Sequence, residues 1–235
     1  MTRRVSYLVL AQRAWQAVAG VVTLVFVTHF LSPMEQGYFY TLTSIAALHM
    51  ALDMGLSAIL LQFAARAFVG LTCGFKGRVN GDAPSYFLSL FRLSFRWYGM
   101  AAVIMLFAYP FGLLFIAGGQ GGLSYDWHGP WALLVCVTAT NFLFLPVLAL
   151  TEGSGGVAEV YTVRLVQGIV GAAATWVGLL MGCGLYAVAL MPAGSALVAA
   201  VWLYIWRWGM VVQAYHESAV GLAWGTEVWP LQWRI

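Results

Sequence analysis

The amino-acid sequence predicts an all-α integral membrane protein with six transmembrane helices and with both termini on the cytoplasmic side. First, 62% of the residues are hydrophobic and only 8% are charged, whereas soluble domains carry about a quarter charged residues. Second, the uncharged stretch Leu165–Trp206 would measure roughly 60 Å as a helix, the length of two bilayer crossings. Third, Lys and Arg fall only in segments that a six-helix arrangement places on one side of the membrane.

Six apolar segments account for the expected helices. We expect them near residues 12–31, 38–65, 97–117, 131–150, 160–181 and 185–206. The second segment is interrupted only by Asp53, and the last two must be joined by a tight turn, for which Gly182-Cys183-Gly184 is suited because glycine tolerates sharp turns. Prolines within or beside spans three, four and six predict kinks there: Pro110, Pro146 and Pro192.

The distribution of charge predicts the orientation and the domain organisation. With a cytoplasmic N-terminus, no Lys or Arg falls in the three exterior connections, near 32–37, 118–130 and 182–184. Residues 1–208 should form one six-span lobe, and residues 209–235 a cytoplasmic or interfacial tail. The net charge of +3 is then a topology signal and does not indicate nucleic-acid binding. The three cysteines form no metal or disulfide pattern, and no cofactor motif is present, so we expect no cofactor.

Asp53 is the most unusual residue within a span. A carboxylate at the centre of a membrane helix costs about 2.5–3.5 kcal/mol on insertion, and such residues normally face the bundle interior or a cavity. His49 precedes it by four positions and Ser57 follows by four, so the three share one helical face. Two interpretations remain open: a structural pair that holds the bundle together, and an ion-coupling site made by His49 and Asp53.

Two matching stripes of polar and small residues run along spans one and five. Span one carries Arg13, Gln16, Gly20 and Thr23, and span five carries Arg164, Gln167, Gly168, Gly171 and Thr175. Each stripe places an arginine near the cytoplasmic end of an outward-running helix, where its guanidinium fork is suited to phosphate oxygens. Alternatively, both arginines only anchor the topology and the glycines only allow close packing. Asn141, within span four, is expected to bond a neighbouring helix.

Several of these segments resemble one family. The sequence resembles the start of bacterial polysaccharide and O-antigen flippases, which belong to the multidrug, oligosaccharidyl-lipid and polysaccharide exporter superfamily. The resemblance covers most of the chain and is carried by degenerate motifs: Arg13-x-x-Gln16-x-x-x-Gly20, Leu31-Ser-Pro-Met-Glu-Gln-Gly37, Asp53-Met-Gly55-Leu56-Ser57, and Glu159-Val-Tyr-x-x-Arg164-x-x-Gln167.

The resemblance implies one lobe of a two-lobe transporter of the bacterial inner membrane. Such a protein flips undecaprenyl-pyrophosphate-linked oligosaccharide for polysaccharide biosynthesis and is not an enzyme. The implied partners are this lipid-linked glycan, membrane lipids and a second lobe or another subunit, since Trp229–Ile235 resembles the entry to a seventh helix. Arg13, Gln16, Arg164 and Gln167 are the candidate substrate-binding residues.

Three other functions remain open. A cation-coupled drug exporter of the same superfamily would use His49 and Asp53. A membrane glycosyltransferase or acyltransferase is disfavoured, because the exterior loops are short and nearly uncharged. A purely structural membrane subunit is the third.

Overall fold

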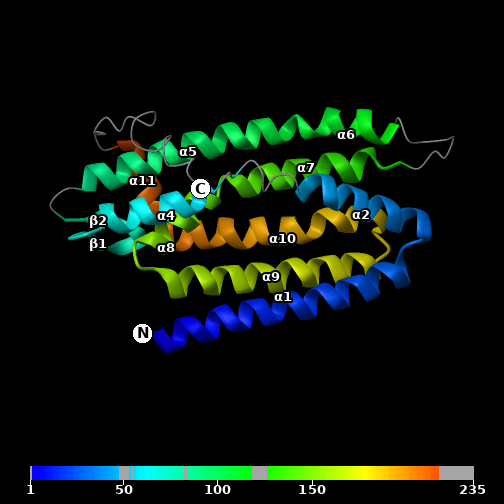
Figure 1. Cartoon of the computed structure of the whole chain (residues 1–235), viewed down its shortest axis with the longest axis horizontal. Helices are drawn as coiled ribbons and strands as arrows, with labels where there is room; N and C mark the ends of the chain where they lie inside the picture. Colours follow the sequence, from blue (N-terminus) through cyan, green and yellow to red (C-terminus); the bar gives the residue numbers. More distant parts are fainter. Residues whose placement is uncertain (1, 48–52, 54, 82–83, 118–125, 217–235) are drawn as a thin grey trace.

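Long helices lying side by side along one axis make up the protein (Figure 1). The computed structural model of the chain describes residues 2–47, 53, 55–81, 84–117 and 126–216. Within these residues, five helical segments are long and apolar enough to cross a membrane: Arg3–Phe30, Pro84–Leu114, His128–Gly153, Val157–Leu180 and Gly184–His216. The prediction of an all-α, multi-pass membrane protein is confirmed. The number six and the orientation stay predictions.

The elements follow the chain in order. The first part contains α1 (Thr2–Phe30), α2 (Pro33–Ala47), α4 (Leu56–Ala67), β1 (Thr72–Cys73), η1 (Phe75–Gly77) and β2 (Val79–Asn80). The middle contains α5 (Pro84–Leu106), α6 (Ala108–Ala117), α7 (His128–Phe142) and α8 (Leu145–Gly153). The last part contains α9 (Val157–Leu180), η2 (Gly184–Tyr186), α10 (Ala187–Trp202), η3 (Leu203–Arg207) and α11 (Trp208–His216). Strands β1 and β2 pair antiparallel.

The second expected span is not one continuous helix. Gly55, directly before α4, has a φ of 71°, a left-handed conformation that an α-helix cannot contain. Helix α2 lies at the end of the molecule where α1 ends, and α4 lies near the opposite end (Figure 1). Among the described residues, the segment expected at 38–65 is therefore divided between α2 and α4.

Two of the expected kinks are helix breaks. Proline has no N–H with which to bond the carbonyl four residues earlier. For Pro110 that carbonyl belongs to Leu106, where α5 ends, and for Pro146 it belongs to Phe142, where α7 ends. Pro192 is accommodated inside α10. The last helical segment continues through the π-helical turn η3 to His216, so the expected boundary at 208 falls within it, and residues 217–235 of the expected tail lie outside the described part.

A tight turn and a glycine contact join α9 to α10. Gly182 and Gly184 both have positive φ, of 75° and 55°, so the turn predicted at this sequence is confirmed. Along the helices, a Cβ built on Gly171 would lie 2.7 Å from the carbonyl oxygen of Met191, and one built on Gly194 would lie 2.9 Å from the Cα of Gly171. The two backbones are thus in direct contact at this crossing.

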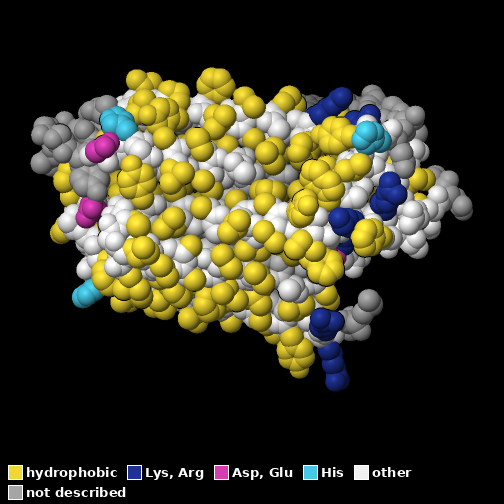
Figure 2. Space-filling model, turned by 180° about the vertical axis from the view of Figure 1, so that it is seen from behind, with side chains coloured by type: hydrophobic (Ala, Val, Ile, Leu, Met, Phe, Trp, Pro, Cys, Tyr) yellow, Lys and Arg dark blue, Asp and Glu magenta, His cyan; other side chains and the backbone are white. Residues whose placement is uncertain are grey.

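The outer surface suits a lipid environment. Figure 2 shows hydrophobic side chains spread over the length of the molecule, with Lys and Arg gathered at the end where the N-terminus lies. Helix α1 alone exposes Tyr7, Leu10, Val18, Val21 and Leu24. Such a gathering of Lys and Arg at one end is what the positive-inside rule requires of a protein oriented as the sequence predicts.

The glycine crossing leads to a stability prediction. Gly171→Ala places a methyl group against the Met191 carbonyl, and such overpacking typically costs about 1–3 kcal/mol. We expect a lower unfolding temperature for the detergent-solubilised variant. The control is Gly20→Ala in α1, where a Cβ meets nothing within 4 Å. Equal unfolding temperatures for the two variants would contradict the proposed contact.

Candidate functional site

Asp53 accepts two hydrogen bonds from other parts of the bundle. Ser57 Oγ of α4 donates to Asp53 Oδ2 at 2.7 Å, and the hydroxyl of Tyr98, a buried residue of α5, donates to Oδ1 at 2.5 Å. Asp53 and Ser57 were expected to share one helical face, and their side chains are in direct contact. His49, the other half of the expected ion-coupling pair, lies outside the described residues.

The two arginines of the matching stripes have different surroundings. Arg13 and Gln16 are both exposed on α1. The Arg164 guanidinium forms an ion pair with Glu152 of α8 at 3.1 Å and lies over the ring of Tyr161, 5.4 Å from its centroid. Arg13 is thus accessible to a ligand, whereas Arg164 already pairs with a carboxylate.

Gln167 connects α9 to α10. Its Nε2 donates to the backbone carbonyl of Ser195 at 3.1 Å, and the Ser195 hydroxyl donates to the Gln167 carbonyl at 3.4 Å. Gln16, its counterpart in α1, is exposed instead. The similar spacing of the two stripes therefore does not give two equivalent sites.

A cavity of about 580 Å³ lies among α1, α2, α7, α9 and α10. We call it the hydroxyl-lined cavity, because six uncharged polar side chains line it together with apolar ones: Thr23, Thr43, Thr138, Asn141, Thr175 and Ser195. Four of the five helices belong to long apolar segments that can cross a membrane, so the cavity places polar groups at membrane depth.

The donors of this cavity are largely used within the protein. The Thr175 hydroxyl donates to the Gly171 carbonyl at 3.0 Å, and the Asn141 amide donates to the Val137 and Pro192 carbonyls at 3.0 Å each. The contact with Pro192 confirms the interhelical bond expected of Asn141. Each hydroxyl oxygen retains lone pairs after donating. The cavity is therefore lined by uncharged side chains, mostly apolar, with a few hydroxyl and amide groups that can accept hydrogen bonds from a ligand's O–H groups.

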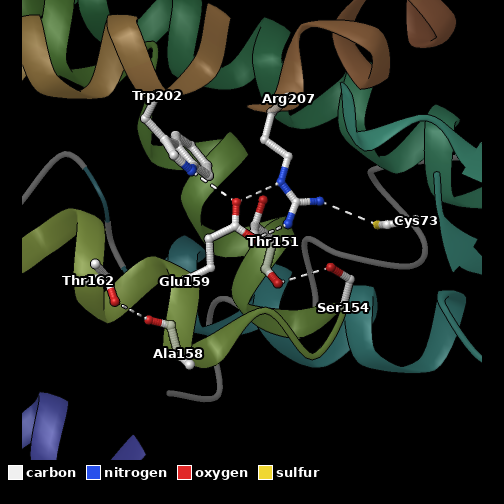
Figure 3. A network of polar contacts seen from close by, with 8 residues as sticks. All are labelled: Cys73, Thr151, Ser154, Ala158, Glu159, Thr162, Trp202 and Arg207. Carbon is white, nitrogen blue, oxygen red and sulfur yellow. Dashed lines mark hydrogen bonds and ion pairs between the residues drawn. The ribbon is translucent and has the colours of Figure 1, made fainter. Parts of the chain in front are cut away.

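A second polar group lies at the end of the molecule that carries the basic residues. Glu159 of α9 accepts from Trp202 Nε1 at 2.9 Å and from Arg207 Nε at 3.1 Å, and its other oxygen pairs with Arg207 Nη2 (Figure 3). Arg207 Nη1 also reaches the Cys73 sulfur at 3.3 Å. The ion pair thus joins α9, α10, η3 and the β1–β2 hairpin.

Sequence reasoning missed Tyr98, Glu159 and Arg207. Tyr98 lies near the expected start of span three, where an aromatic residue is typical of an interfacial anchor, yet it is buried beside Asp53. Arg207 directly follows the expected span at 185–206, where a basic residue is typical of a cytoplasmic topology signal. The signal available for Glu159 and Arg207 was their opposite charges at the predicted cytoplasmic ends of spans five and six, which a hairpin brings together.

Comparison of the chain with known protein families, with curated proteins and with solved structures gives no match. The function therefore has to be argued from the site itself.

The two ion pairs differ in a way that stability measurements can detect. The Arg207 side chain is only 8% exposed, whereas that of Arg164 is 35% exposed. Glu159→Gln leaves a buried cation without its partner and is expected to cost about 2 kcal/mol. Glu152→Gln should cost at most about 1 kcal/mol, because Arg164 can turn to water. Thermal unfolding of both variants in detergent tests this order, and an equal loss in the two would contradict it.

Proposed function

We propose that the chain is one lobe of a flippase that moves a lipid-linked oligosaccharide across the bacterial inner membrane for polysaccharide biosynthesis. The observation that carries the proposal is the hydroxyl-lined cavity, which brings six uncharged polar side chains from five helices to membrane depth. Polar residues are costly in a bilayer and are normally kept there for a function.

The chemistry of the cavity matches a sugar better than it matches an ion or a drug cation. A sugar presents many O–H donors and no charge, and the cavity offers neutral acceptors without a carboxylate among its lining residues. A charged ligand in the same place would lack an opposite charge, which makes its transfer from water unfavourable.

The remaining parts of the substrate have candidate contacts as well. In this proposal, exposed Arg13 and Gln16 meet the pyrophosphate first at the cytoplasmic end, and the Arg164 guanidinium joins them after parting from Glu152. Gln167 then acts by holding α9 to α10. Undecaprenyl is the lipid and a second lobe or subunit is the partner, both as the resemblance implies.

The proposal is tested with Thr138→Val in a cell that carries the complete transport system. Valine keeps the shape of threonine and removes one hydroxyl, and the loss of one hydrogen bond of about 1 kcal/mol slows translocation about fivefold. The expected result is less surface glycan and accumulated lipid-linked oligosaccharide in the inner leaflet.

Thr28→Val is the matched control, since Thr28 is exposed on α1 and its hydroxyl donates to the Val25 carbonyl of the same helix. Deletion of the whole gene with no change in surface glycan or in the lipid-linked intermediate would overturn the flippase proposal.

Asp53 favours a second candidate, a cation-coupled drug exporter. A carboxylate that accepts bonds from Ser57 and Tyr98 beside a break in the helix is suited to taking up and releasing a cation. This candidate requires the negative charge, whereas a structural role requires only the hydrogen bonds.

Asp53→Asn separates these two roles. If the chain exports cations or drugs, we expect cells with the asparagine variant to be as sensitive to toxic cationic dyes as cells without the gene, while protein levels stay normal. Asp126→Asn, a change at an exposed carboxylate, serves as the control. Full dye resistance with Asp53→Asn would exclude coupling through this charge.

A further inference from the structure

An apolar groove of about 1110 Å³ runs between α9 and α10 and continues along η3. We call it the α9–α10 groove. Its walls are formed mainly by aliphatic side chains, Val163, Val166 and Val170 from α9 and Leu197, Val198 and Val201 from α10. Three of these, Val166, Leu197 and Val201, are among the exposed hydrophobic residues, so the groove opens onto the outer surface of the bundle.

The groove has one closed end and one polar end. It stops at Val170, next to the crossing where Gly171 contacts the backbone of Met191. At the other end lie Glu159, Arg207 and Lys76. Both oxygens of Glu159 are bonded to Arg207 or Trp202. The negative charge of Glu159 and the positive charge of Arg207 therefore compensate each other. The lining residues thus carry two positive charges and one negative charge, which leaves +1 from Lys76.

Lys76 occupies this end in an unusual backbone conformation. Its φ of 53° makes it the one non-glycine residue with positive φ among the described residues. Such conformations cost of order 1 kcal/mol and persist where the surroundings fix them. The ammonium lies 5.8 Å from the Phe75 ring centroid and 6.0 Å from that of Tyr204, and no described carboxylate forms an ion pair with it.

Helix α11 and the end of η3 fix the hairpin that carries Lys76. Gln213 pairs with Val79 as a neighbouring strand would: its Oε1 accepts from the Val79 N–H at 2.8 Å and its Nε2 donates to the Val79 carbonyl at 2.9 Å. A Cβ on Gly209 would lie 2.8 Å from the Lys76 carbonyl, and one on Gly77 would lie 2.9 Å from Arg207 Cδ. The charge of Lys76 is thus held at the mouth of the groove.

We propose that the α9–α10 groove binds an anionic phospholipid of the surrounding bilayer, with one acyl chain between α9 and α10 and the phosphate at the Lys76 ammonium. The apolar walls match a hydrocarbon chain, and the net positive charge at the polar end matches a phosphate. The lateral opening admits a molecule that is already in the membrane. The site lies on the other side of the glycine crossing from the hydroxyl-lined cavity and does not depend on the flippase proposal.

Binding of lipid to the purified full-length chain in detergent, followed by native mass spectrometry, tests this site. Phosphatidylglycerol is the anionic probe and phosphatidylcholine the zwitterionic one. A Lys or Arg near the membrane surface favours an anionic lipid by about fivefold in affinity. We expect this preference in the unchanged protein and its loss in Lys76→Ala, with Arg4→Ala, an exposed arginine of α1, as the control.

A second variant tests the apolar part of the site. Val166→Trp fills the groove and should weaken both lipids, while unfolding temperatures report whether the variant remains folded. If it does not fold, the Lys76→Ala result alone decides, because that change lies on the surface of the hairpin.

Four outcomes would overturn the proposal: an unchanged preference in Lys76→Ala, an equal loss of preference in Arg4→Ala, displacement of lipid by millimolar inorganic phosphate, or a dimer in the spectrum whose formation Val166→Trp abolishes. The third would indicate a phosphate site, and the fourth a second copy of the chain in the groove. Surface glycan plays no part in this experiment, so its failure and that of the flippase proposal can be told apart.

Discussion

The contact between Gly171 and Gly194 sets how closely α9 and α10 approach each other. It brings the backbones of α9 and α10 together at one point, and the space between the helices is thereby divided. On one side of the crossing, Thr175 and Ser195 face the hydroxyl-lined cavity, and on the other side, Val170 and the residues before it face the α9–α10 groove. Two spaces thus lie on either side of one close approach, one with hydroxyl and amide groups among its lining residues and one with mainly aliphatic walls.

Several polar groups within the bundle are bonded to other elements. Tyr98 binds Asp53 and Asn141 binds the Pro192 carbonyl, and Trp202 shares Glu159 with Arg207. In lipid a polar group without a protein partner cannot form a hydrogen bond to water instead, so these contacts specify which helices are neighbours. The same groups give the protein its candidate chemistry, because each one places a charge or a lone pair where the bilayer would otherwise be apolar.

The helical class, the turn at Gly182 and the breaks associated with Pro110 and Pro146 were predictable, because hydropathy, glycine and proline act locally. Asp53 was predictable as a candidate because charge is rare within spans. Its partner Tyr98 was not, since an aromatic residue near a span end is more often an interfacial anchor. The hydroxyl-lined cavity could not be predicted from the sequence either. Threonine and serine commonly bond their own helix, and only the packing of five helices shows which threonine and serine side chains face one space.

The pairing of Gln213 with Val79 joins positions 134 residues apart in the chain. A hairpin with two-residue strands is not stable by itself, so this one acquires its partner only after the ribosome has made α11. Most of the apolar helices have then already been synthesised. Lys76 therefore takes up its place at the mouth of the groove late in biogenesis, and a nascent chain that stops before residue 213 carries the same lysine on an unanchored loop.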